Sequence, residues 1–293
     1  MTAARDTDTI EPVESPESDQ IELATDEVEE VRERERLRAP VIFEIIRREG
    51  EEELTRPATA LFYSGLAAGI AIGFSLLSEA VLHAYLPDMP SRHLIESFGY
   101  TVGFLTVILA RMQLFTENTL TVVLPLLMKP NRASLARTAR LWGIVLGANV
   151  IGCFLFAAAL LIPGVLSPAV LEACLSVSEH MMENSPWQMF IKGIFAGWLI
   201  ATLVWLLPTA DEAKFWAIGL MTYLIAAGDF THIVAGSAEG FLLVLHGDIS
   251  IGHMILAFFL PTLLGNVVGG TGLFAALTYA QVSDEIRPWS RFK

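Results

Sequence analysis

The chain has 293 residues, of which 53% are hydrophobic, and its formal net charge is −13. About six apolar stretches follow residue 57, so the composition excludes an ordinary soluble domain and predicts a polytopic helical membrane protein. The acidity is unevenly spread, because residues 1–56 hold 18 acidic and 8 basic side chains. The net charge therefore describes the N-terminal segment and carries no information about what the apolar part binds.

The N-terminal segment divides into two parts. Residues 1–40 are rich in Glu, Asp, Ser and Pro and poor in large apolar groups, which predicts a disordered acidic tail. Residues 41–56 are apolar in their first half and charged in their second, which is typical of an amphipathic helix at a membrane surface. We expect residues 57–285 to form the membrane domain and 286–293 a short C-terminal tail.

Two of the expected spans are too long for a simple crossing. The six apolar stretches run over about 57–83, 98–128, 141–162, 187–207, 215–245 and 251–280. A bilayer crossing needs only about 20 residues, and ionisable side chains at mid-membrane depth usually face a cavity, a partner or a pathway. The second stretch carries Arg111 and Glu117, and the fifth carries Asp229 and His232. Both are therefore predicted to be broken helices.

The two halves of the membrane domain repeat. LFTEN at 114–118 resembles DFTHI at 229–233, which pairs Phe115 with Phe230. GANVIG and GNVVGG follow, with Asn149 and Asn266 expected to hydrogen-bond the broken backbone. Three spans in each half require the halves to cross the membrane in opposite senses. The pattern predicts an inverted repeat of 3+3 spans with broken helices 2 and 5, which is typical of a transport site at the bilayer midplane.

Basic residues indicate the orientation. The segment 128–140 holds four Lys or Arg residues and 287–293 holds three, whereas 163–186 holds none. The positive-inside rule therefore predicts that both termini are cytoplasmic.

These motifs, taken in order, resemble the formate/nitrite transporter family, in an outlying YfdC-like branch. The resemblance rests on LFTEN in the second stretch, F-x-H-x-V-A in the fifth and G-N-x-x-G-G in the sixth, and it covers about 41–285. It implies an all-α, aquaporin-like protomer of six transmembrane helices, assembled as a homopentamer in the inner membrane of a bacterium. It also implies passage of small monovalent anions, such as formate or nitrite, or of their weak acids.

The resemblance carries specific residues. His232 matches the central pore histidine, and an imidazole, with an ordinary pKa near 6.5, can exchange a proton with a weak-acid anion. The other matches are Leu114, Phe115 and Thr116 in the loop that interrupts the second span, Phe230 as a constriction aromatic, and Lys192 near the outer vestibule.

This chain also departs from the family pattern. Gly197 and Gly236 stand where the family often has Asn, and Asp229 stands where Gly is usual. We expect Asp229 to hydrogen-bond His232 or to cap the second half-helix. Arg111 and Glu117 are expected to form an ion pair that fixes the loop. Lys192 can equally snorkel to lipid headgroups.

Other classes of protein are less compatible with these residues. Neither H-E-x-x-H nor G-x-S-x-G occurs, so an intramembrane enzyme with a catalytic residue or a metal is not expected. We also expect no cofactor and no nucleic-acid partner. Paired Asn-Pro-Ala motifs of a water or glycerol channel are also missing. A non-conducting membrane scaffold or sensor with the same fold, and a channel for a different small solute, remain alternatives.

Overall fold

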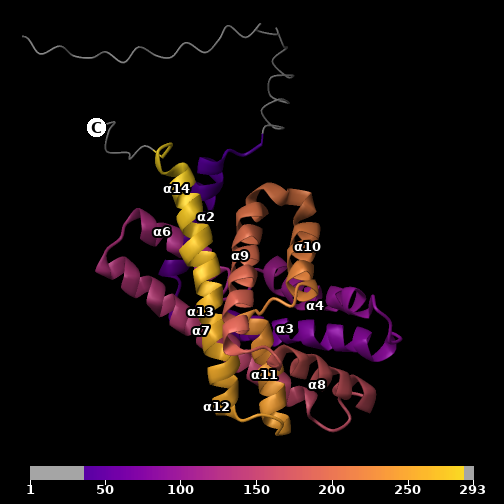
Figure 1. Cartoon of the computed structure of the whole chain (residues 1–293). Coiled ribbons are helices and arrows are strands. Elements are labelled where there is room, and N and C mark those ends of the chain that lie inside the picture. Colours follow the sequence, from indigo (N-terminus) through magenta and orange to yellow (C-terminus); the bar gives the residue numbers. More distant parts are fainter. Residues whose placement is uncertain (1–35, 287–293) are drawn as a thin grey trace, which may run out of the picture. The chain divides into compact units, whose positions relative to one another are not determined.

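The computed structural model describes residues 36–286, and the regular elements in that range are all helical (Figure 1). The expected tails at 1–40 and 286–293 lie almost entirely outside the described residues. Within residues 36–286, four helical runs are long and apolar enough to cross a membrane: Ala58–Tyr85, Arg132–Leu160, Pro186–Ala227 and Ile251–Ser283. Two shorter apolar helices, Asn118–Met128 and Ile233–His246, accompany them.

The elements follow one another with few irregular residues between them. In chain order they are α2 (Ala39–Thr55), α3 (Ala58–Tyr85), α4 (Arg92–Leu109), α5 (Asn118–Thr121), α6 (Val123–Met128), α7 (Arg132–Leu160), α8 (Pro168–Met182), α9 (Pro186–Ala210), η1 (Asp211–Ala213), α10 (Lys214–Ala227), α11 (Ile233–His246), α12 (Ile251–His253), η2 (Met254–Phe259), α13 (Leu260–Val267), η3 (Val268–Ala275) and α14 (Ala276–Ser283).

Helix α2 is amphipathic and packs by its apolar face. A proline in its first turn suits a helix start, and Phe43 and Ile46 are fully buried. It lies against α6, α9 and α14. Gly50 makes this approach close, because a Cβ there would collide with the backbone carbonyl of Thr121. Its place at a membrane surface stays a prediction.

The run from Pro186 to Ala227 is a hairpin rather than one rod. The chain reverses at η1, where Asp211 has a positive φ of 30°, and α9 and α10 then lie side by side (Figure 1). The last run contains two π-helical segments, η2 and η3, on either side of α13.

The surface of the described chain differs from that of a soluble protein, although the interior is mostly apolar in both. Large apolar side chains such as Tyr63, Phe98, Trp216 and Leu256 are exposed. Polar side chains, many of them Thr and Ser, are buried among the helices. An apolar exterior of this extent fits contact with lipid or with other protomers.

Several helices extend beyond the apolar stretches that predicted them. Helix α4 begins at Arg92 rather than near 98, and α7 begins at Arg132 rather than near 141. Hydropathy detects the apolar part of a helix, whereas a helix continues for as long as its backbone hydrogen bonds do. The segment 163–186, expected to be a loop, contains α8.

Candidate functional site

The first interruption follows α4. Arg111 adopts the left-handed conformation with φ 53°, and the Met112 N–H donates to the Val107 carbonyl at 3.0 Å. The Arg111 N–H donates to the Ile108 carbonyl at 3.1 Å. This pair of hydrogen bonds is a Schellman ending, which terminates a helix by turning the chain out of its axis. The chain then runs without a helix until Asn118.

The second interruption, after α10, ends the helix in the same way. Asp229 has φ 51°, and the Phe230 N–H donates to the Ile225 carbonyl at 2.9 Å. The Asp229 N–H donates to the Ala226 carbonyl at 2.9 Å. Helix α11 starts four residues after Asp229, at Ile233.

One asparagine holds each interruption. Asn149 of α7 accepts the Phe115 N–H at 2.9 Å and donates to the carbonyls of Gly65 (2.8 Å) and Gln113 (2.9 Å). The Phe115 N–H and the Gln113 carbonyl are backbone groups that the broken helix leaves without helical partners, and the bond to Gly65 ties the asparagine to α3. This bonding agrees with the expectation for Asn149.

Asn266 of α13 repeats the arrangement. It accepts the Ile233 N–H at 2.9 Å and donates to the carbonyls of Gly193 (2.8 Å) and Thr231 (3.0 Å). Both asparagines are fully buried. A buried side chain that satisfies three backbone groups fixes the path of the loop that it contacts.

These hydrogen bonds correct the register of the repeat. Phe115 and Ile233 donate to equivalent asparagines, so Leu114 corresponds to His232. The pairing of Phe115 with Phe230, based on LFTEN and DFTHI, is wrong by three residues. Phe230 instead corresponds to Met112, because each follows the left-handed residue of its interruption.

His232 and Thr116 meet where the two interruptions approach each other. The Nε2 atom of His232 lies 2.7 Å from the Thr116 hydroxyl, and both side chains are buried. The Nδ1 atom accepts the Ala235 N–H at 3.2 Å, so His232 is itself the N-cap of α11. Since Nδ1 accepts, the ring proton is on Nε2, and the imidazole donates to Thr116. The ring is neutral in this arrangement.

Apolar side chains surround this contact. The Phe104 ring meets the His232 ring edge-on, with centroids 4.9 Å apart. Leu114 and Phe115 are buried beside it, with Phe115 packed edge-on against Trp142 at 5.5 Å. They provide a low-polarity environment on the Thr116 side.

A cavity lies on each side of the contact. The larger, about 550 Å³, reaches His232 and is also lined by His83, His93 and His180; we call it the histidine cavity. The smaller, about 310 Å³, is lined by Glu49 and other residues of α2, and we call it the α2 cavity. Glu117, the neighbour of Thr116, lines the α2 cavity. The histidine cavity thus reaches His232 itself, and the α2 cavity reaches Glu117, the chain neighbour of Thr116.

Comparison with known proteins assigns the family. The family model for formate/nitrite transporters matches residues 40–280. The chain belongs to the formate/nitrite transporter family. Inner membrane protein YfdC of Escherichia coli (strain K12) is 43% identical over 275 residues, which are 92% of this chain and 89% of that protein.

Solved structures agree on the fold. A pentameric formate channel with formate bound superposes with a TM-score of 0.68 at 21% identity, covering 77% of this chain and 97% of that one. A formate/nitrite transporter family ion channel gives a TM-score of 0.70 at 21% identity, covering 82% and 98%. The chain is thus an all-helical, membrane-embedded transport protein of this family.

Close packing accounts for one departure from the formate/nitrite transporter pattern. A Cβ at Gly197 would collide with the backbone of Asn266, and a Cβ at Gly69 would collide with the backbone of Asn149. Any larger residue would push the asparagine away from its interruption. A Cβ at Gly236 would meet the side chains of Phe258 and Met181, which can move.

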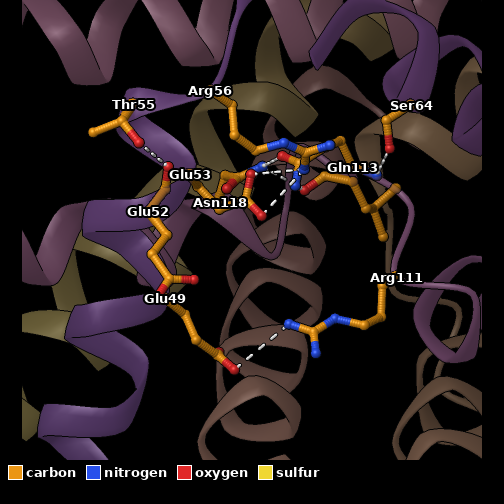
Figure 2. A network of polar contacts seen from close by, with 10 residues as sticks. Glu49, Glu52, Glu53, Thr55, Arg56, Ser64, Arg111, Gln113 and Asn118 are labelled. Atoms are coloured by element: carbon orange, nitrogen blue, oxygen red, sulfur yellow. Dashed lines mark hydrogen bonds and ion pairs between the residues drawn. The ribbon is translucent and has the colours of Figure 1, made fainter. Parts of the chain in front are cut away.

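The expected ion pair between Arg111 and Glu117 does not form. The Arg111 guanidinium instead reaches Glu49 of α2 at 3.8 Å, as Figure 2 shows. Glu117 points into the α2 cavity, which Lys214 also lines. Burial raises the pKa of Glu49 above its ordinary value, and the nearby Arg111 opposes this rise. Glu117 was expected as the partner of Arg111 because it is near in sequence, but α2 packs over the interruption and brings Glu49 to Arg111.

Figure 2 also shows how polar side chains hold the first interruption. The Gln113 N–H donates to the Ser64 hydroxyl at 3.1 Å, and Asn118 donates to the Gln113 side chain at 3.1 Å. The Asn118 amide also donates to the Leu114 carbonyl at 3.2 Å. The loop therefore has a defined path over its whole length.

Asp229 also has other partners than expected. It neither caps α11, a role that His232 takes, nor bonds to His232. Its carboxylate lies 3.6 Å from His93 and 3.6 Å from His180. Phe230 lines the histidine cavity and stacks on Phe195 at 5.1 Å. Lys192, half-buried on α9, lines neither cavity of the described chain.

Sequence reasoning missed Glu79 and Glu96 among the carboxyl groups of the histidine cavity. Glu79 lies in the first apolar stretch and Glu239 in the fifth, and both line this cavity. Glu96 and Tyr100 of α4 line it as well. A carboxyl group inside an apolar stretch was the signal that could have identified Glu79.

Proposed function

We propose that this chain is a channel or transporter for small monovalent anions, of the formate or nitrite type, or for their weak acids. The observation that carries the proposal is the buried Thr116–His232 contact between two cavities. Two cavities separated by one polar side-chain pair suit a small solute that passes the Thr116–His232 contact in a single step. We call this contact the closed point of the path.

The closed point favours a neutral solute. Moving an anion into a dry apolar environment costs far more than moving its conjugate acid, so protonation lowers the barrier. The apolar neighbours Phe104, Leu114 and Phe115 supply that environment. Thr116 and His232 provide the hydrogen bonds that a carboxylic or nitrous acid group requires.

The geometry limits the part that His232 plays in proton transfer. With Nδ1 accepting the Ala235 N–H, the neutral ring orients the Thr116 hydroxyl, which can then donate its proton in a hydrogen bond to the solute. His232 becomes an acid only when Nδ1 gains a proton, and that requires the cap on α11 to open. Proton exchange and helix capping are therefore coupled at one residue.

The proposal includes six membrane crossings arranged as an inverted repeat. Helices α3, α7 and α9 supply three crossings, and the run from α12 to α14 supplies another. The pairs α4 with α5–α6 and α10 with α11 supply the two broken ones. The equivalent bonding of Asn149 and Asn266 supports the repeat.

Charge supports a cytoplasmic location for both termini. Helix α2 packs on α6 and α14, close to the basic segment 128–140, so the α2 cavity would open to the cytoplasm. Helix α8, in a segment without Lys or Arg, lines the histidine cavity on the opposite side. We further propose a homopentamer in a bacterial inner membrane, as the pentameric structural relative suggests.

Flux into liposomes tests the proposal. Purified protein is reconstituted, and uptake of formate, nitrite, acetate and uncharged urea is measured at about pH 5.5 and about pH 7.5, on either side of the ordinary histidine pKa. We expect uptake of the weak acids above that of protein-free liposomes, with a rise at the lower pH. A folded oligomer that moves none of the weak acids would favour the scaffold or sensor, whereas transport of urea alone would indicate a different solute.

A further inference from the structure

Two buried carboxyl groups face the histidine cavity without a partner. Glu79 of α3 is 8% exposed and Glu239 of α11 is 7% exposed, and both line the cavity wall. Within residues 36–286, neither side chain makes a hydrogen bond or an ion pair. A buried carboxylate without a partner is strongly unfavourable, and carboxylates at membrane depth normally pair. A cation from outside the chain would offset this cost.

Glu96, which is also buried, and Asp229, which is more exposed, do have partners in this cavity. Glu96 lies 2.9 Å from His83 and 3.5 Å from Arg92. Asp229 lies between His93 and His180, at 3.6 Å from each. No Lys or Arg from the described residues lines the cavity. The basic side chains nearby thus serve Glu96 and Asp229, and none serves Glu79 or Glu239.

We propose that the histidine cavity binds a small monovalent ammonium-type cation, either ammonium or a primary alkylammonium, at Glu79 and Glu239. The two glutamates lie on α3 and α11, which pack against each other. An ammonium group carries only N–H donors, and carboxylates are its strongest acceptors in proteins. Such a ligand supplies both the positive charge and the donors that this part of the cavity lacks.

The rest of the cavity favours this class over a metal ion. In the described part of the chain, no group of three His, Cys, Asp or Glu side chains could hold a metal. A volume of about 550 Å³ exceeds what a bare ion fills and accommodates a short alkyl chain or several waters. Tyr100 and Phe230 add aromatic rings to the wall, and aromatic faces attract organic cations.

Cation binding in the histidine cavity is a separate property from anion transport, and it can be measured without a transport assay. A bound cation would offset the negative charge that an entering anion meets in the histidine cavity. Binding is nevertheless measured on detergent-solubilised protein, so a failure of the liposome experiment leaves the binding result unaffected, and the reverse also holds.

The test is a thermal unfolding series at constant ionic strength. Wild-type protein in a lithium chloride buffer is titrated with ammonium, methylammonium, sodium or potassium chloride. Ammonium and methylammonium should raise the unfolding temperature in a saturable way, by on the order of a few degrees, because the cation binds only the folded state. Sodium and potassium at the same concentrations should leave it unchanged.

Two variants locate the site. Glu79→Gln and Glu239→Gln should each abolish the saturable shift. In lithium chloride alone, both variants should unfold at a temperature at least as high as wild type, because an unpaired charge is gone. Glu172→Gln, an exposed position on α8 outside the cavity, should keep the full shift. If a Gln variant fails to fold, the wild-type series still decides. No shift with any cation, an equal shift with sodium and potassium, or a full shift in both Gln variants would overturn the proposal.

Discussion

The two interruptions are built alike but carry different chemistry. Each begins with a left-handed residue, Arg111 or Asp229, and each is held by one buried asparagine. At the position before the N–H that this asparagine accepts, the first has Leu114 and the second has His232. The backbone is therefore held in the same way at both interruptions, and at this position only the second has a titratable side chain.

Features that both interruptions share are required by the broken backbone, whereas a feature found in only one of them is a candidate for function. Both asparagines satisfy three backbone groups, and the glycines packed against them leave no room for a Cβ. These are demands of a broken helix inside a membrane. His232 caps α11 as well, but an asparagine could do the same, so its imidazole calls for a functional explanation.

The largest expected effect comes from removing either asparagine. Asn149→Leu and Asn266→Leu each leave one N–H and one carbonyl of an interruption without partners, at about 1–3 kcal/mol per group. Both variants should therefore lose most of their folded oligomer, as measured by size-exclusion chromatography in detergent. The matched control is Asn131→Ala, which removes an exposed cap of α7 and should cost only about 1 kcal/mol. Tolerance at one site and collapse at the other would show that the two interruptions are not equivalent.

A smaller effect is expected at the hydroxyl that His232 contacts. Thr116→Val keeps the shape but removes the hydrogen bond at 2.7 Å, and we expect weak-acid flux to fall at least about tenfold, equivalent to about 1.4 kcal/mol. Thr116→Ser should retain most of the flux, because it keeps the hydroxyl. Thr121→Val, whose hydroxyl bonds only to the Glu117 carbonyl, is the control. Equal flux in the Val and Ser variants would mean that the hydroxyl has no part in passage.

The charged pair at the first interruption should have a modest, salt-dependent effect. Arg111 lines the α2 cavity, and its guanidinium nitrogen lies 3.8 Å from a Glu49 carboxylate oxygen, which offsets part of its positive charge. Arg111→Gln should lower initial formate flux by about two- to threefold at low ionic strength, and the effect should vanish at high salt. Glu49→Gln should leave that flux unchanged or raise it. Changes of the same sign in both variants would point to packing of α2 rather than to charge.

The smallest effect concerns the pH dependence of α2. The guanidinium of Arg47, with help from Arg48, lowers the pKa of Glu44 from 4.5 to about 2. A depressed folded-state pKa stabilises the helix above about pH 4.5, and that contribution is lost as the pH falls toward 2. Because the Glu44 side chain is 39% exposed, solvent screening keeps it below about 1 kcal/mol.

Hydrogen exchange of α2 at about pH 5 and about pH 3, corrected for intrinsic rates, measures this contribution. Wild type should lose protection at the lower pH, and Glu44→Gln should be less protected at about pH 5 and change less. Glu52→Gln, an exposed neighbour, should behave as wild type does. An unchanged pH dependence in Glu44→Gln would assign the loss to other groups.

The helical fold and the site of each break were predictable from the sequence, because apolar length and misplaced polar residues are local signals. The family followed from the order of the motifs. The register of the repeat was not predictable. The sequence shows a shared Phe-Thr pair, whereas the hydrogen bonds to Asn149 and Asn266, which define the equivalent positions, are visible only in the structure. The partner of Arg111 was missed because α2 reaches the interruption only in the folded chain. The unpaired Glu79 and Glu239 are 160 positions apart in the sequence. They line one cavity only because α3 packs against α11.

The most direct measurement compares weak-acid flux in wild type and His232→Asn over a range of pH. Asparagine can still cap α11 and contact Thr116, but it cannot titrate. We predict that the variant assembles normally, that its formate flux loses or changes its pH dependence, and that His253→Asn, an exposed position in α12, keeps the wild-type profile. An unchanged flux and pH profile in a normally assembled His232→Asn protein would show that the histidine serves only the structure of the second interruption.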